Sequence, residues 1–232
     1  MKRAGILGGM SWESTITYYR IINEKVTESL GGCNCADMVI RSLNLAEIDA
    51  HQRRGEWDAV AEILCRAAQE LEQMNVDFII MASNTVHRIY DKVQEAVNVP
   101  VLHIAEPTVE AAKQAGMTTA GLLGTRYTME GDFLKEKLNE AGIGVVVPSP
   151  EKIGQIHEVI FNEPCMGEPR REIREMFREV IEELREQGAQ CIILGCTELG
   201  MMIKEEDSCL PMFDTAVLHA RKTAEEILNI SL

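Results

Sequence analysis

Asn75-Val-Asp-Phe-Ile-Ile-Met-Ala-Ser-Asn-Thr85 recurs later in the chain as Gly188-Ala-Gln-Cys-Ile-Ile-Leu-Gly-Cys-Thr-Glu198. Both stretches pass through a short apolar run into a polar turn, which is typical of a buried strand that ends in a loop. Two further segments repeat in the same order: 5–15 parallels 121–131, and 99–105 parallels 210–216. Each match is weak by itself, but three collinear matches indicate that the chain contains one structural unit twice.

Short apolar runs alternate with helical patterns in each half of the chain. We predict buried strands at 4–7, 78–82, 120–123 and 191–194, and amphipathic helices at 57–74 and 171–187. Such alternation indicates parallel sheets with helices on both faces. The predicted fold class is therefore α/β, with two similar domains related by pseudo-two-fold symmetry and the active site between them. We expect the first domain to span 1–105 plus a C-terminal helix at about 215–232, and the second to span 106–214.

Polar residues follow the predicted strands, at the edge where open α/β sheets bind ligands. These turns lie at 9–12, 83–85, 125–128 and 196–198. If the two halves face each other, the turns meet in one cleft, which is a favoured place for a small-molecule site.

Composition narrows the class of partner and cofactor. The net charge of −14 lacks the basic footprint that nucleic acids and anionic membranes require. No apolar run approaches the length of a membrane span, and the apolar stretch near the N-terminus is too short for a secretory signal. We therefore expect a cytoplasmic protein. The seven cysteines, an odd number, are expected to be free thiols, and neither cysteine nor histidine spacing predicts a metal site. The glycine patterns typical of NAD and ATP sites do not occur.

Cys196 is the leading candidate for chemistry. It follows an apolar strand and precedes a predicted helical turn, where the pKa of a thiol falls below its free value of about 8.5. Cys65 and Cys191 lie within apolar patterns and are interpreted as buried thiols. The repeat places Ser83 at the position symmetric to Cys196, which strengthens a functional interpretation of both.

The turn 83–85 also has an ordinary structural interpretation, since Ser, Asn and Thr are all favoured at helix N-caps. Backbone N–H groups at such a turn are suited to bind a carboxylate as well. Gly8 and Gly9 are expected to let the backbone approach a small substrate closely. We expect His87 and His219 to orient turns or fill space rather than to catalyse.

The segments 7–15, 52–57, 83–87, 123–130, 195–198 and 213–216 resemble the aspartate/glutamate racemase family, and the similarity covers essentially the whole chain. They look most like the L-aspartate/glutamate-specific branch. The resemblance implies two α/β domains in a homodimer, no cofactor such as pyridoxal phosphate, and an acidic amino acid as substrate. It also implies a two-base mechanism, with Cys196 on one face of Cα and the position of Ser83 on the other. Substrate-binding roles carry over to Met10, Gln52, Asn84, Thr85, Thr125, Thr197 and Glu198.

Two positions depart from the family pattern. Most members carry cysteine, and the L-specific branch threonine, where this chain has Ser83. A serine hydroxyl is far less acidic than a thiol and is a poor base at neutral pH. Related aspartate-acting members also carry a lysine near the stretch 162–167, and this chain has none there.

The leading hypothesis is an isomerase that interconverts L- and D-aspartate or glutamate, with Cys196 as thiolate acid/base and Ser83 opposite. Three alternatives remain: an amino-acid-binding protein, a decarboxylase-like enzyme that protonates a carbanion from one face, and a variant with an engineered Cys→Ser replacement.

Overall fold

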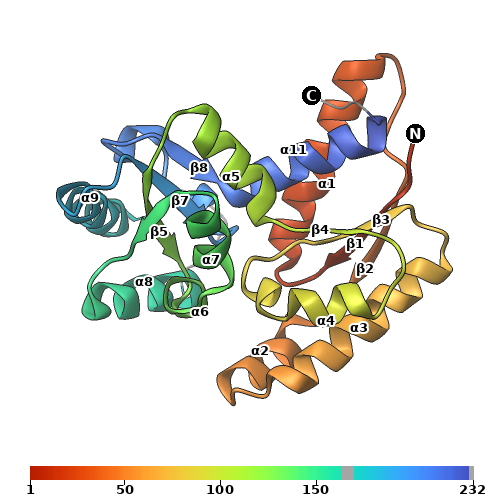
Figure 1. Ribbon diagram of the computed structural model, residues 1–232, viewed down its shortest axis with the longest axis horizontal. Helices are drawn as coiled ribbons and strands as arrows, with labels where there is room; N and C mark the ends of the chain where they lie inside the picture. The colour runs from red at the N-terminus through yellow and green to blue at the C-terminus, as the bar shows by residue number, and fades with distance from the viewer. Residues whose placement is uncertain (163–169, 230–232) are drawn as a thin grey trace. The chain divides into compact units, whose positions relative to one another are not determined.

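The computed structural model describes residues 1–162 and 170–229 and divides into two compact units (Figure 1). Unit 1 comprises Met1–Ile104 and His219–Leu232, and unit 2 comprises Ala105–Leu218. In the described part of the chain, each unit contains one four-stranded parallel sheet with helices packed against it. The predicted α/β class with two similar parallel-sheet domains is confirmed.

Unit 1 is built on a sheet in the strand order β2-β1-β3-β4. Helix α3 packs against β1 and β2, and its apolar residues recur at three- and four-residue spacings, as expected for an amphipathic helix. The elements are β1 (Ala4–Gly8), α1 (Trp12–Leu30), β2 (Met38–Ser42), α2 (Leu45–Arg53), α3 (Trp57–Gln73), β3 (Phe78–Met81), the 3₁₀ turn η1 (Thr85–Ile89), α4 (Tyr90–Glu95) and β4 (Val101–Leu102).

Unit 2 repeats this arrangement with the order β6-β5-β7-β8. Its elements are α5 (Ala105–Gln114), β5 (Thr119–Gly124), α6 (Arg126–Glu130), α7 (Phe133–Glu140), β6 (Gly144–Val146), α8 (Pro150–Asn162), α9 (Arg171–Glu186), β7 (Cys191–Gly195), α10 (Leu199–Met202), the 3₁₀ turn η2 (Glu205–Asp207) and β8 (Met212–Asp214). Helix α11 (Thr215–Leu228) begins in unit 2, and its residues from His219 onward belong to unit 1.

The sequence repeat reappears as equal strand register in the two sheets. Leu7 pairs with Met81 between β1 and β3, and the corresponding Leu123 pairs with Leu194 between β5 and β7. The pairing of β3 with β4 matches that of β7 with β8 in the same way. The repeated segments therefore occupy equivalent places, and the carboxyl ends of β3 and β7 are equivalent points in the two units.

Alternating residues of the unit 2 strands face two separate cores. Leu123, Ile192 and Leu194 belong to a cluster with residues of α8 and α9, such as Phe177. Leu122 and its neighbours on the other strand face belong to a second cluster with residues of α5 and α7. Burial on both faces explains why the central strands are continuous apolar runs rather than alternating ones.

The sequence patterns did not predict the strands at the edges of the two sheets. β2 and β6 are short and mostly exposed or half-buried, so their residues carry neither a long apolar run nor a clean alternation. β4 and β8 lie inside the repeated segments 99–105 and 210–216 but were too short to be predicted as strands. Asn75 and Gly188, which open the two quoted stretches, both have positive φ, so the repeat extends to the turn before each central strand.

Candidate functional site

The residues proposed from sequence form two groups, one in each unit. In unit 1, Ser83, Asn84 and Thr85 come just after β3, and Met10 comes after the neighbouring strand β1. Gln52 lies on α2, near its end. In unit 2, Cys196, Thr197 and Glu198 follow β7, and Thr125 follows the neighbouring strand β5. All are buried except Glu198, which is half-buried.

The Cys196 thiol contacts a carboxylate within its own turn. Its Sγ lies 2.9 Å from Glu198 Oε2, and the same oxygen accepts a hydrogen bond of 2.8 Å from Thr197 Oγ1. Because a carboxylate is an acceptor at neutral pH, the thiol proton points at Glu198. Glu198, predicted from sequence to bind substrate, is thus placed where it can take or return the proton of Cys196.

A helix dipole is a weaker influence on this thiol than the sequence suggested. The following helix, α10, has only the four residues Leu199–Met202. A macrodipole sums aligned peptide dipoles, so one turn contributes little. The helical turn predicted after Cys196 is therefore present but short, and Glu198 is a direct side-chain contact of the thiol.

The Ser83 turn is held by a buried histidine. His87 Nδ1 donates to the Ser83 carbonyl at 2.8 Å, and its Nε2 accepts from the backbone N–H of Ile104 at 3.2 Å. Burial, together with the nearby His103 and His219, keeps the pKa of His87 well below its ordinary value. The imidazole is therefore neutral, and it joins the ends of β3 and β4, in line with the turn-orienting role expected for His87.

His219 plays a similar structural part in unit 1. Its Nδ1 accepts from the Tyr18 hydroxyl at 3.0 Å, and its Nε2 donates to the Leu102 carbonyl at 3.1 Å. Burial lowers the pKa of His219 to about 3, so this ring is neutral as well. The two buried imidazoles of His87 and His219 are therefore both neutral.

Gly8 and Gly9, at the end of β1, make close contacts within unit 1. A Cβ at Gly8 would lie 2.7 Å from Thr15 Cγ2, and one at Gly9 would lie 2.1 Å from the Leu43 carbonyl oxygen. Gly9 also has φ of +82°, and its N–H donates to Thr15 Oγ1 at 2.8 Å. Contacts within unit 1 thus favour glycine at both positions, and the close approach to a substrate stays a prediction.

Two of the proposed substrate-binding residues carry visible structural roles. Met10 packs in the apolar core cluster of unit 1. Thr125 is the N-cap of α6, where its carbonyl accepts from the N–H groups of Thr128 and Met129. A substrate contact from either position would therefore involve the small exposed part of the residue or its backbone.

Asp214 is a residue that sequence reasoning did not single out. It ends β8, and its Oδ1 accepts from the N–H groups of Ala216 and Val217 at 2.8 and 3.1 Å. Burial raises the pKa of Asp214 to about 6, and the charge of Glu198 adds to the rise despite the two backbone hydrogen bonds. The available signal was the repeat, in which Asp214 stands where the first half has His103.

The remaining sequence expectations concern thiols, metals and membranes. Cys191 is fully buried and its pKa is raised by burial to about 11, whereas Cys65 is half-buried and donates to the Lys92 carbonyl. Cys165 and the lysine-free stretch 163–167 lie outside the described residues. Across 1–162 and 170–229, no group of three or more His, Cys, Asp or Glu side chains could hold a metal ion. In the same part of the chain no helix combines the length and hydropathy needed to cross a membrane.

Comparison with known proteins gives consistent matches. Residues 7–223 match the family described as Asp/Glu/Hydantoin racemase. A provisional Asp/Glu racemase of Yersinia pestis is 40% identical, with a TM-score of 0.91 over 98% of this chain and 100% of that one. An aspartate racemase homologue of Pyrococcus horikoshii is 35% identical, with a TM-score of 0.85 over the same shares. The broad-specificity amino-acid racemase RacX of Bacillus subtilis is 26% identical over 97% of both chains.

Proposed function

Because the chain belongs to the Asp/Glu/hydantoin racemase family and is an isomerase that acts on amino acids, we propose that it racemises aspartate or glutamate without a cofactor. In this proposal Cys196 acts as thiolate acid/base on one face of Cα, and Ser83 occupies the opposite acid/base position. The observation that carries the proposal is the equivalence of these two residues, since each follows the second central strand of its sheet in the same register.

The proposed reaction begins with proton transfer inside the Cys196 turn. The S–H bond breaks, the proton moves to Glu198 Oε2, and the negative charge passes to Sγ. The thiolate then removes the α-proton from one enantiomer, and the electron pair stays on Cα as a carbanion. The Ser83 hydroxyl then protonates the carbanion from the opposite face, which inverts the centre and leaves Ser83 as an alkoxide. Ser83 regains a proton from water and Glu198 gives up its proton to water, which restores the starting state.

The polar side chains around the two turns are proposed to hold the carboxylates of the substrate. Asn84 and Thr85 supply donors in unit 1, and Thr197 in unit 2, while Gln52, Thr125 and the Met10 backbone complete the set. Preorganised donors of this kind stabilise charge that develops on the substrate in the transition state. They also explain how a protein of net charge −14 binds an anionic substrate, because local dipoles outweigh a distant field.

The presence of serine at position 83 points to a second candidate activity, in which the α-proton is exchanged from one face only. A serine hydroxyl is a much weaker acid and a much weaker neutral-pH base than a thiol, and the neutral His87 contacts the Ser83 carbonyl rather than its hydroxyl. We therefore propose a strong asymmetry between the two enantiomers. We also propose the homodimer that the resemblance implies and a cytoplasmic location.

Incubation of the protein with each enantiomer of aspartate and of glutamate in deuterated water tests the function. We expect loss of the α-proton NMR signal for at least one acidic amino acid, with formation of its mirror image at an equal or lower rate. Alanine and lysine serve as controls for substrate class. Absence of α-exchange with all four acidic enantiomers would rule out the proposed activity.

A further inference from the structure

The two turns that carry Ser83 and Cys196 are held in different ways. After β7, the Cys196 carbonyl accepts from the backbone N–H of Leu199 at 3.1 Å. After β3, the equivalent Ser83 carbonyl accepts from a side chain, through His87 Nδ1, at 2.8 Å. In the repeat, His87 corresponds to Gly200, which has no side chain to make such a contact. The unit 1 turn is therefore held by an imidazole, and the unit 2 turn by its own backbone.

The two contacts of the His87 ring determine which of its nitrogens carries the proton. A carbonyl oxygen can only accept, so Nδ1 carries the hydrogen that points at Ser83. A backbone N–H can only donate, so Nε2 is the bare nitrogen that accepts from Ile104 at 3.2 Å. Burial, together with His103 and His219, lowers the pKa of His87 and favours this neutral form. The ring thus satisfies two backbone groups in a single tautomer.

Aromatic neighbours fix the orientation of the His87 ring. The side chain is buried, its ring is stacked on that of Tyr90 with an interplanar angle of 9°, and the centroid of the His103 ring lies 4.7 Å away. The Tyr90 hydroxyl in turn donates to the Val101 carbonyl on β4 at 2.8 Å. Such packing leaves a side chain few alternative rotamers. The imidazole is therefore a fixed link between the end of β3 and Ile104, which follows β4.

The hydrogen bond to the Ser83 carbonyl fixes the peptide group between Ser83 and Asn84. This peptide group is planar and trans, so its C=O and N–H point in opposite directions and can rotate only together. A carbonyl held by His87 therefore sets the direction of the Asn84 N–H as well. It also fixes the backbone from which Ser83 Cβ projects, and the position of Cβ limits where the hydroxyl can lie.

We propose that His87 is a positioning residue for one face of the reaction, because its bond to the Ser83 carbonyl holds the Ser83 hydroxyl where it can exchange an α-proton. The inference rests on the proposed function, in which Ser83 serves one face of Cα and Cys196 the other. Since the Cys196 carbonyl is held by a backbone N–H, loss of the His87 bond slows exchange at the Ser83 face alone. His87 thereby affects how unequally the two enantiomers react.

Two substitutions separate the donor of the ring from its acceptor. A glutamine amide reaches about as far from the backbone as Nε2, and an asparagine amide about as far as Nδ1. His87→Gln therefore keeps an acceptor for the Ile104 N–H and loses the donor to Ser83, whereas His87→Asn keeps the donor and loses the acceptor. Tyr90→Phe is the matched control, because it removes the bond to the Val101 carbonyl beside the same ring and leaves both hydrogen bonds of His87 in place.

The first measurement is α-deuterium exchange in deuterated water, followed separately for each enantiomer of the accepted amino acid. Ser83→Ala first identifies the enantiomer whose α-proton faces Ser83, as the one that stops exchanging. For that enantiomer we expect His87→Gln to exchange about tenfold more slowly than wild type, since displacing a reacting group by about 1 Å can lower a rate by about 10²-fold. His87→Asn and Tyr90→Phe should stay close to wild type. Exchange of the other enantiomer should be close to wild type in all three variants.

The second measurement is NMR of two single peptide groups, without substrate. Ser83-Asn84 is the one Ser-Asn pair in the sequence, and His103-Ile104 the one His-Ile pair. Labelling the carbonyl carbon of the first residue type and the nitrogen of the second therefore gives one signal for each peptide group. We expect the Ser83 carbonyl carbon to shift upfield in His87→Gln relative to His87→Asn, and the Ile104 amide proton to shift upfield in His87→Asn relative to His87→Gln. Both variants lack the imidazole, so its ring current does not contribute to these differences.

Coincident Ser83 carbonyl signals in His87→Gln and His87→Asn overturn the proposal, whatever the activity. Equal slowing of both enantiomers in His87→Gln also overturns it, as does a loss in Tyr90→Phe as large as in His87→Gln, because either result marks a general structural effect. Absence of exchange in the wild-type protein rules out the proposed function and the role of His87 in it. That outcome is distinguished from the others by carbonyl signals that still differ between His87→Gln and His87→Asn.

Discussion

Replacement of Cys196 with alanine is expected to lower the rate of α-proton exchange by about 10³-fold or more, within the range typical of a lost general acid/base. In the proposed mechanism this thiol is the acid/base group of unit 2, and it donates a hydrogen bond of 2.9 Å to Glu198 Oε2. Alanine leaves Glu198 in place, but a carboxylate two residues along cannot occupy the position of Sγ. The measurement is loss of the α-proton NMR signal of aspartate and glutamate in deuterated water.

A matched control distinguishes chemistry from a general loss of thiols. Cys33 is exposed, and Cys33→Ala is expected to exchange at the wild-type rate. Circular dichroism of Cys196→Ala shows whether the variant is folded, since Cys196 also packs in an apolar cluster of unit 2. A folded Cys196→Ala protein that still exchanges at the wild-type rate would exclude this thiol as the base.

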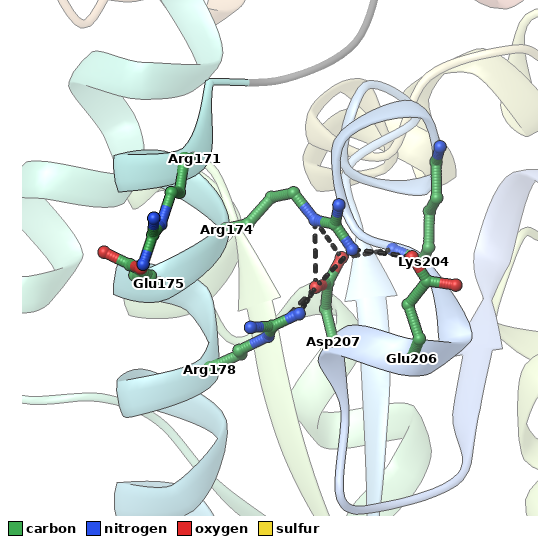
Figure 2. A network of polar contacts seen from close by, with 7 residues as sticks. All are labelled: Arg171, Arg174, Glu175, Arg178, Lys204, Glu206 and Asp207. Atoms are coloured by element: carbon green, nitrogen blue, oxygen red, sulfur yellow. Dashed lines mark hydrogen bonds and ion pairs between the residues drawn. The ribbon is translucent and has the colours of Figure 1, made fainter.

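Replacement of Asp207 with asparagine is expected to destabilise the protein by about 3 kcal/mol at neutral pH, since one member of a buried ion pair is removed. The Asp207 side chain is fully buried and contacts two guanidinium groups, with Arg174 at 2.8 Å and Arg178 at 2.7 Å (Figure 2). Asp207 Oδ2 also accepts from the Lys204 N–H at 3.2 Å. The network attaches η2 to α9. Along the chain, η2 lies between the Cys196 turn and β8.

The control for this prediction is Glu206→Gln. Glu206 pairs with Arg174 at 2.7 Å, but its side chain is 67% exposed. Exposed ion pairs contribute about 0–1 kcal/mol, so Glu206→Gln should change stability little. Urea unfolding followed by circular dichroism measures both variants, because Trp12 and Trp57 lie in unit 1 and do not report on unit 2. Equal effects of the two substitutions would contradict the account of Asp207.

The stabilisation by Asp207 should also depend on pH. Burial opposes its charge, but hydrogen bonds from Arg174, the Lys204 backbone and Arg178 hold the pKa of Asp207 below its ordinary value. A lowered carboxyl pKa stabilises the native state above the unfolded-state value of about 3.9, and the stabilisation is lost as pH falls through the native value. The difference between wild type and Asp207→Asn should therefore shrink below about pH 4.

The internal repeat is the reason that much of the fold could be predicted from sequence. Parallel sheets bury both faces of their central strands, so β1, β3, β5 and β7 carry apolar runs that stand out from their surroundings. The edge strands β2 and β6 carry no such run, because solvent reaches part of their residues. Their existence follows only from pairing with β1 and β5, which is a long-range property.

The sequence indicates which residues form the candidate site, but not how their side chains contact one another. The repeat aligns Ser83 with Cys196, and the structure places both after equivalent strands. The direction of the Glu198 side chain depends on its rotamer and on the one-turn length of α10, which no local pattern reports. The burial of the Asp214 carboxyl depends on its approach to Gly200 from another element, which an acidic residue before a helix does not indicate by itself.

The central claim, that Cys196 and Ser83 serve opposite faces of one substrate, is tested most directly with Ser83→Ala and both enantiomers of the accepted amino acid. In deuterated water, Cys196 can still remove the α-proton of the enantiomer that presents it to the thiol and return a deuteron to the same face. We predict α-deuterium exchange of that enantiomer without inversion, and loss of exchange from the other one. Wild-type rates of exchange from both enantiomers in Ser83→Ala would contradict the account.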